Sequence, residues 1–118
     1  MGGKDDYLRW VLEQLSGAEG VSFRRMFGAF GLYRNEVFFG IISGDTLFFK
    51  VSDANRADYE THGMARFRPY RNKPLLSMSY YEVPADVLED ADECVRWAMR
   101  AVAAGAAKKK SPKPRGLV

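Results

Sequence analysis

Between Val21 and Val51 the chain alternates short, aromatic-rich apolar segments with brief polar interruptions. This pattern predicts four β-strands, at Val21 to Phe27, Phe30 to Tyr33, Val37 to Ile42 and Thr46 to Val51. The links Arg34-Asn35-Glu36 and Ser43-Gly44-Asp45 are too short for a parallel crossover, which needs about a dozen residues. The strands are therefore expected to form an antiparallel meander.

Helical periodicity appears on both sides of this block. Leu8, Val11, Leu12 and Leu15 recur at i, i+3, i+4 and i+7, which predicts an amphipathic helix from Asp5 to Leu15 that Gly17 ends. Ser52 is an N-cap candidate for a short helix from Asp53 to Thr61, ended by Gly63. Pro84 opens a last helix with apolar residues at helical spacing, and Gly105 is expected to end it. Those apolar residues are Leu88, Ala91, Val95, Ala98 and Val102.

Two further strands are expected, at Ala65 to Pro69 and at Leu75 to Val83. The predicted fold is thus α+β, with an antiparallel β-sheet of five to six strands flanked by N- and C-terminal helices. Residues 1–105 form one domain. Residues 106–118 are rich in Lys and Pro, and we expect a basic, disordered tail.

Strand alternation indicates that both faces of the sheet need cover. Val37, Phe39 and Ile41 are expected on one face, with Phe38 and Ile42 on the other. Phe48 is likewise expected on the face opposite to that of its apolar neighbours along the strand. Two long helices cover one face, so the second face is covered either by the short helix and loops or by a partner subunit, as in a homodimer.

Composition places the chain among globular proteins, with 47% hydrophobic and 28% charged residues in 118 positions. No apolar run approaches the roughly 20 residues of a membrane-spanning helix. The N-terminal segment lacks the apolar stretch of a secretory signal, so we expect a cytoplasmic protein. A single cysteine, Cys94, excludes an internal disulfide.

The net charge of +3 is unevenly distributed. Five of the eighteen basic residues lie in the last eleven positions, namely Lys108, Lys109, Lys110, Lys113 and Arg115. Without them, thirteen basic residues face fifteen acidic ones, a net charge of −2. The tail could contact nucleic-acid phosphates or only solubilise the chain, whereas the domain itself is not basic.

Catalytic and cofactor motifs find little support. Gly28 and Gly31 form a G-x-x-G with no strand-to-helix transition, so strand glycines at a bulge explain them better than a phosphate loop. The run from Arg25 to Phe30 is similar to the RNA-stacking strand of RNA-recognition motifs, but it loses that register after Gly28. Ser43 lacks a nucleophile-elbow motif, and a triad would have to use the single histidine, His62.

The remaining candidates for chemistry are scattered. Cys94 has no Cys or His at ligand spacing, so a buried hydrophobe is expected rather than a metal ligand. An enzyme would need dispersed carboxylates such as Glu36 and Asp45. We therefore predict no catalytic residue, no metal and no cofactor.

The densest positive cluster of the predicted domain is formed by Arg66, Arg68, Arg71 and Lys73. It could bind phosphates or an acidic protein surface, or it could serve as edge charge that discourages aggregation. Tyr80 and Tyr81 are adjacent on a strand and must face opposite sides, so one of them is expected in the core.

Three segments resemble one family in order along the chain: RRMFGAFGLY, DTLFFKVSDANRADYE and KPLLSMSYYEVPADVLEDADECVRWAMRA. They look like the N-terminal domain of TfoX/Sxy proteins. The resemblance implies an α-β-α fold similar to secretion chaperones, and the chain is identified as a single-domain member. The family-signature positions it suggests are Arg25, Phe27, Gly28, Gly31 and Tyr80.

The resemblance also implies a function. Family members are associated with the regulation of natural competence in bacteria, and the best-known ones look like coactivators that work with the cyclic-AMP receptor protein. We therefore expect a non-enzymatic interaction module with a protein partner, such as a transcription factor, and no membrane association. Its candidate surface consists of Phe38 and Phe48 together with the Arg66 to Lys73 cluster. The alternative is a nucleic-acid-associated protein that uses this cluster and the tail.

Overall fold

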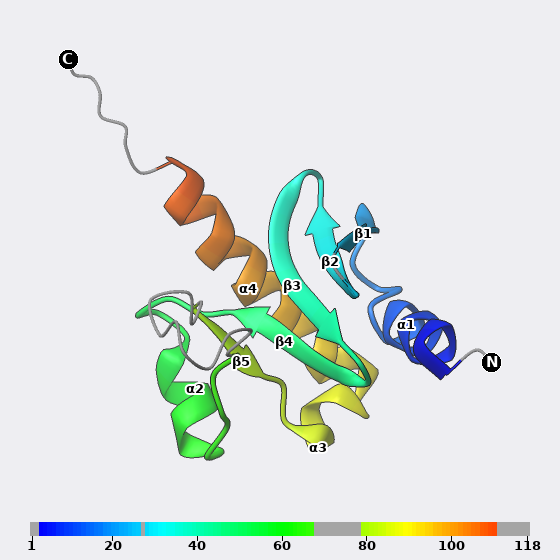
Figure 1. The fold of residues 1–118 in the computed structure, drawn as a ribbon. Coiled ribbons are helices and arrows are strands. Elements are labelled where there is room, and N and C mark those ends of the chain that lie inside the picture. Colours follow the sequence, from blue (N-terminus) through cyan, green and yellow to red (C-terminus); the bar gives the residue numbers. More distant parts are fainter. Residues whose placement is uncertain (1–2, 27, 68–78, 111–118) are drawn as a thin grey trace.

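A computed structural model describes residues 3–26, 28–67 and 79–110. They form an antiparallel β-sheet of five strands in the order β1-β2-β3-β4-β5, with helices before, within and after it (Figure 1). The elements are α1 (Gly3–Gln14), β1 (Val21–Met26), β2 (Ala29–Arg34), β3 (Val37–Ser43), β4 (Thr46–Lys50), α2 (Arg56–Thr61), β5 (Tyr80–Glu82), α3 (Ala85–Leu88) and α4 (Ala91–Lys110). Of the described helices, none is both long and apolar enough to cross a membrane. The predicted α+β fold and its meander are confirmed.

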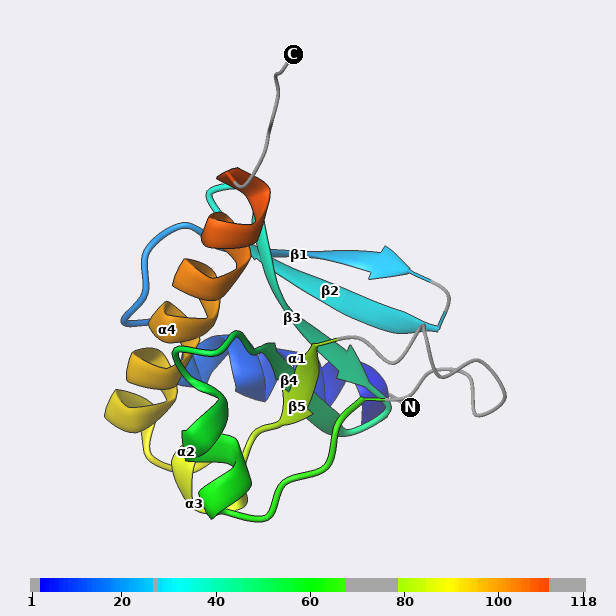
Figure 2. The ribbon, with the colours of Figure 1, turned by 90° about the vertical axis from the view of Figure 1, so that its left-hand side faces the viewer.

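One hydrophobic core fills the space between the helices and one face of the sheet, which we call the helix face. Figures 1 and 2 show α4 running along β3 and β4 on this side. Every described helix contributes buried side chains: Leu8 and Val11 from α1, Tyr59 from α2, Val87 and Leu88 from α3, and Cys94, Ala98 and Ala101 from α4. The sheet contributes Phe30, Leu32, Phe39, Ile42, Leu47, Phe49 and Tyr81. Burial against the sheet thus fixes α1, α2 and α3, which are too short to be stable alone.

Both predicted hairpin turns are present. Arg34 pairs with Val37 across a two-residue turn in which Asn35 and Glu36 have φ of +49° and +72°. Two successive positive φ values are typical of a type I′ turn, whose twist suits a hairpin. Ser43 pairs with Thr46 around Gly44, which has φ of +64°. These turns hold β2, β3 and β4 in their antiparallel order.

A β-bulge in β3 changes the predicted distribution of side chains between the faces. Leu32 pairs with Gly40 and Tyr33 with Phe38, so Phe39 is the extra residue. A Cβ on Gly40 would lie 3.3 Å from core side chains of β2 and β4, which places this position on the helix face beside Phe39. The prediction that Ile41 shares a face with Phe39 is therefore wrong. Ile42 enters the core instead.

The single C-terminal helix expected from Pro84 is two helices. Pro84 precedes the short α3, and α4 starts only at Ala91. Between them Asp90 accepts a hydrogen bond from the backbone N–H of Glu93 through Oδ1 (3.2 Å), and its carbonyl accepts from Cys94 (2.8 Å). Asp90 thus acts as a new N-cap, which starts a second helix in a different direction.

Gly105 does not end α4, contrary to the prediction, because the helix continues to Lys110. The expected tail therefore starts as helix. A Cβ at Gly105 would lie 2.7 Å from the carbonyl oxygen of Phe38 and 3.1 Å from Cγ1 of Val37. The missing side chain lets the helix backbone approach β3 closely. This glycine serves helix-to-sheet packing rather than helix termination.

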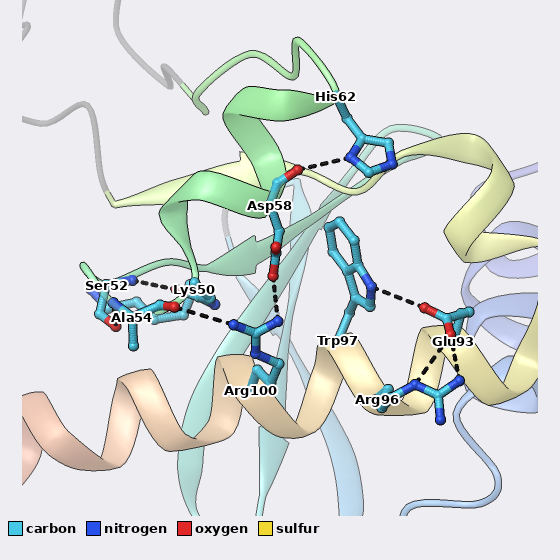
Figure 3. Close-up of polar contacts among 10 residues, drawn as sticks. Lys50, Ser52, Ala54, Asp58, His62, Glu93, Arg96, Trp97 and Arg100 are labelled. Carbon is cyan, nitrogen blue, oxygen red and sulfur yellow. Dashed lines mark hydrogen bonds and ion pairs between the residues drawn. The ribbon is translucent and has the colours of Figure 1, made fainter.

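The short helix α2 begins at Arg56, three residues later than predicted, and Asn55 rather than Ser52 is its N-cap residue. Asn55 is buried and ties the preceding turn together, accepting from the Ser52 N–H at 2.7 Å and donating to the Lys50 carbonyl at 3.2 Å. Arg100 of α4 forms an ion pair with Asp58 of α2 (Figure 3). This exposed ion pair thus connects α2 to α4.

The predicted strand at Ala65 to Pro69 contributes one β-bridge, between Arg66 and Tyr81. Phe67 donates its N–H to the Tyr80 carbonyl (2.8 Å), and Glu82 donates to the Ala65 carbonyl (2.9 Å). We call residues 65–67 the edge cover, because they lie along the outer side of β5. The predicted strand from Leu75 is confirmed only for its last part, since residues 68–78 lie outside the described residues.

Candidate interaction surfaces

The face of the sheet opposite the helix face, here called the second face, carries a row of aromatic rings. Tyr33 of β2 stacks on Phe38 of β3, with ring centroids 5.1 Å apart and planes at 29°. Phe38 in turn lies 5.6 Å from Tyr80 of β5. We call these three residues the aromatic row. Tyr33 and Phe38 are half-buried, whereas Tyr80 is buried.

Cations close both ends of the aromatic row. The guanidinium carbon of Arg24 lies 4.8 Å from the centre of the Tyr33 ring, and Nζ of Lys50 lies 5.1 Å from the centre of the Tyr80 ring. Such cation–π contacts contribute about 0.5–2 kcal/mol each, depending on burial. Burial also raises the pKa of the Tyr80 hydroxyl, so this ring stays neutral. The aromatic row is therefore flanked by one cation from β1 and one from β4.

The positions predicted as family signatures lie in different parts of this region. Gly31 lies under the aromatic row, where a Cβ would be 2.9 Å from Sδ of Met26 and 3.1 Å from the Phe38 ring. Tyr80 is a member of the row. Gly28, with φ of +78°, lies in the turn between β1 and β2 rather than at a bulge. Arg25 lies on the helix face instead, 3.9 Å from Asp5. Phe27 lies outside the described residues.

The two aromatic residues of the predicted partner surface, Phe38 and Phe48, do share the second face. Phe48 packs against Phe67 of the edge cover, with ring centroids 4.7 Å apart. Sequence reasoning missed Phe67, although its place on a predicted strand next to Arg66 was a usable signal. The structure separates Arg66 from these rings, because its guanidinium lies 5.9 Å from the centre of the Tyr81 ring on the helix face.

The other basic candidates are only partly described. Arg68, Arg71 and Lys73 lie outside the described residues, so the predicted cluster around Arg66 stays a prediction. Lys108, Lys109 and Lys110 belong to the last turns of α4. Lys113 and Arg115 lie beyond the described part of the chain.

The described residues that could carry chemistry do not converge. Cys94 is fully buried in the core, and burial raises the pKa of its thiol to about 12, which disfavours the reactive thiolate. His62 ends α2, where Nδ1 lies 2.8 Å from the Asp58 carbonyl. Glu36 and Asp45 lie in turns at opposite ends of β3. Among residues 3–26, 28–67 and 79–110, no three His, Cys, Asp or Glu side chains are grouped to hold a metal ion.

A cavity of about 320 Å³ lies between α4 and the turn that precedes α2. Its lining is Ser52, Ala54, Asn55, Arg100, Ala103 and Ala104. The guanidinium of Arg100 pairs with Asp58 and donates a hydrogen bond to the Ala54 carbonyl at 3.1 Å (Figure 3). The cation that lines the cavity therefore already has protein partners, and the remaining lining is largely apolar.

The antiparallel meander and the helices around it agree with the fold that the family resemblance implies. The sequence profile described as the TfoX N-terminal domain matches residues 13–105. The chain belongs to this family. The match ends at the glycine where α4 touches β3, so it includes the whole sheet and most of the helical layer. A search of curated proteins finds no match.

Proposed function

We propose that this member of the TfoX N-terminal domain family is a non-enzymatic protein-interaction module that acts in the cytoplasm as a coactivator-like partner of a transcription factor. The observation that carries the proposal is the second face of the sheet. Its half-buried rings, Tyr33, Phe38 and Phe48, lie opposite the face that every described helix covers. Aromatic residues with Arg at the border are enriched in protein interfaces.

The thiol and carboxylate groups of the described residues lie far from one another, so the geometry favours binding as the activity of this domain. The buried Cys94 thiol is held in its protonated form, and the acidic residues of the turns are far apart along β3. A row of packed rings instead offers a preorganised surface, because stacked side chains lose little further freedom on binding. The family resemblance names the class of partner to test first, the cyclic-AMP receptor protein.

The test measures binding of the labelled full chain to purified cyclic-AMP receptor protein, with cyclic AMP and promoter DNA, by fluorescence anisotropy. Phe48→Ser should weaken binding about tenfold or more, since a central aromatic residue contributes more than about 1.4 kcal/mol to many interfaces. The matched control is Met99→Ser, because Met99 is a similarly large, exposed side chain on α4. Circular dichroism of both variants shows whether each keeps its fold.

Loss of binding in the Phe48 variant alone supports the proposal. Equal binding by both variants, or no binding by the natural chain, contradicts the coactivator role.

The second candidate is a nucleic-acid-associated protein, favoured by the continuation of α4 into Lys108, Lys109 and Lys110. A chain that ends at Gly105 should then lose DNA affinity, and the affinity of the full chain should fall steeply with salt. DNA binding that is unchanged in the shortened chain contradicts this candidate.

A further inference from the structure

The strand β1 forms one border of the sheet and, among the described residues, pairs only with β2 (Figure 2). The backbone N–H of Asn35 donates to the carbonyl of Gly20 at 3.1 Å, which fixes the alternation of hydrogen-bonded pairs along β1 and β2. By this alternation Ser22 and Arg24 direct their backbone groups to β2. Val21, Phe23 and Arg25 direct theirs outward.

These outward groups have no backbone partner among residues 3–26, 28–67 and 79–110. Phe23 is also one of two large hydrophobic side chains that the described chain exposes, at 40%. An edge strand with unpaired backbone groups and an exposed ring is a template for another strand.

The two arginines of β1 do not block this edge. The guanidinium of Arg24 lies over Tyr33 of the neighbouring strand. That of Arg25 lies 5.2 Å from the centre of the Phe30 ring and 3.9 Å from Asp5 of α1. Both side chains are thus drawn back over the chain's own sheet and helix, and the residues from Ser22 to Arg25 are exposed in the described structure.

We propose that β1 pairs antiparallel with β1 of a second copy of this chain, so that Phe23 of one copy faces Phe23 of the other across a two-fold axis. In this register Val21 faces Arg25 of the second copy, and all three outward residues exchange backbone hydrogen bonds. The ring of Phe23 already meets Phe30 edge-on at 5.8 Å. Pairing therefore joins four rings across the axis and forms one continuous sheet.

The sequence of β1 disfavours the neighbouring registers. A shift in one direction places Arg24 directly opposite Arg24 of the second copy, and like charges in that position are destabilising. A shift in the other direction leaves Arg25 beyond the end of the paired strands. The register centred on Phe23 is the one that pairs every outward residue without opposing two arginines.

Cysteine cross-linking of the full chain tests the register. Residues that face each other in a hydrogen-bonded pair have Cα atoms about 5.5 Å apart, within the range of a disulfide. Under mild oxidation Phe23→Cys should therefore give a covalent dimer on a non-reducing gel. The natural Cys94 is fully buried and should give no background.

Val21→Cys is the matched control, because two copies of residue 21 lie four positions out of register and more than about 10 Å apart. Ser22→Cys and Arg24→Cys report the two shifted registers. Cross-linking that is strongest at either of them overturns the proposed pairing.

Light scattering tests the assembly itself, and the natural chain should show twice its mass of 13.3 kDa. Phe23→Pro removes an outward N–H and leaves the bonds to β2 in place, so it should weaken self-association about tenfold or more. A monomeric natural chain at every concentration overturns the proposal, as does a dimer that neither cross-links at position 23 nor responds to Phe23→Pro. This inference goes beyond the proposed function and stands or falls separately, because that function rests on the second face.

Discussion

At the β5 border of the sheet the edge cover, residues 65–67, pairs the outward carbonyl of Tyr80 and the outward N–H of Glu82. At the β1 border the outward backbone groups of Val21, Phe23 and Arg25 stay open among the described residues. Most of β1 is exposed, while Tyr80 and Tyr81 of β5 are buried. The chain thus uses one edge for stability and leaves the other for contact. Substitutions at the two edges should therefore differ in kind: those at β5 should change folding, and those at β1 should change association.

The largest contrast is expected for the two aromatic residues of the edge strands. Tyr81→Ala should lower the free energy of unfolding by about 3–5 kcal/mol, since it opens a cavity beside Tyr59 in the core. Phe23→Ala removes an exposed ring and should cost less than about 1 kcal/mol. Urea unfolding of both variants, at concentrations where the chain is monomeric, measures the difference. Equal losses would show that β1 is as much a part of the core as β5.

A pair of prolines sharpens the comparison by removing one backbone donor at each edge. Phe67→Pro should cost about 2–3 kcal/mol, because the N–H of Phe67 donates to Tyr80 and its ring packs on Phe48. Phe23→Pro should cost less than half as much, since its N–H points away from the sheet. Thermal unfolding followed by circular dichroism measures both. A larger loss for Phe23→Pro would contradict the alternation assigned to β1.

A change on α4, where this helix packs against the central strand β3, should affect stability without favouring either edge. Gly105→Ala places a Cβ 2.7 Å from the carbonyl oxygen of Phe38. The free energy of unfolding should fall by a net amount of about 1–2 kcal/mol, even though the higher helix propensity of alanine contributes about 1 kcal/mol in the opposite direction. Urea unfolding measures the loss. Adding the same substitution to the Phe23→Cys variant should leave the yield of disulfide cross-linked dimer unchanged. A more stable protein would mean that α4 does not need this close approach.

The smallest effect is expected at the hairpin turn between β2 and β3. Glu36 has φ of +72°, which is unfavourable for a side chain with a Cβ and easy for glycine. Glu36→Gly should therefore raise the free energy of unfolding by about 0.5–1 kcal/mol. Glu36→Ala keeps the Cβ and is the control, with no gain expected. Similar melting temperatures for the two variants would contradict the type I′ assignment.

Much of the fold was predictable because local signals dominate it. Short polar links forced antiparallel neighbours, and the spacing of Leu8, Val11 and Leu15 placed α1 on the core. The opposite orientations of Tyr80 and Tyr81 followed from strand geometry alone. Strand order, and therefore the edge position of β1, is a direct consequence of the meander.

Other features depend on contacts that local patterns do not report. The bulge at Phe39 exchanges the faces of Ile41 and Ile42, and it arises where Gly40 leaves room for Leu32 and Phe49. Gly105 looks like a helix terminator in sequence and is a packing contact in space. The residues of the candidate surface divide between the two faces for the same reason: Phe38 and Phe48 share a face, but strand pairing turns Arg66 to the other one.

The asymmetry of the two edges also limits growth. When two open β1 edges join, the outer borders of the combined sheet are the two β5 edges, each covered by the short segment 65–67. A symmetric contact of this kind uses up its own binding site and is closed, whereas a head-to-tail contact can continue into a filament. If β1 pairs as proposed, the edge cover should therefore end the assembly at two copies.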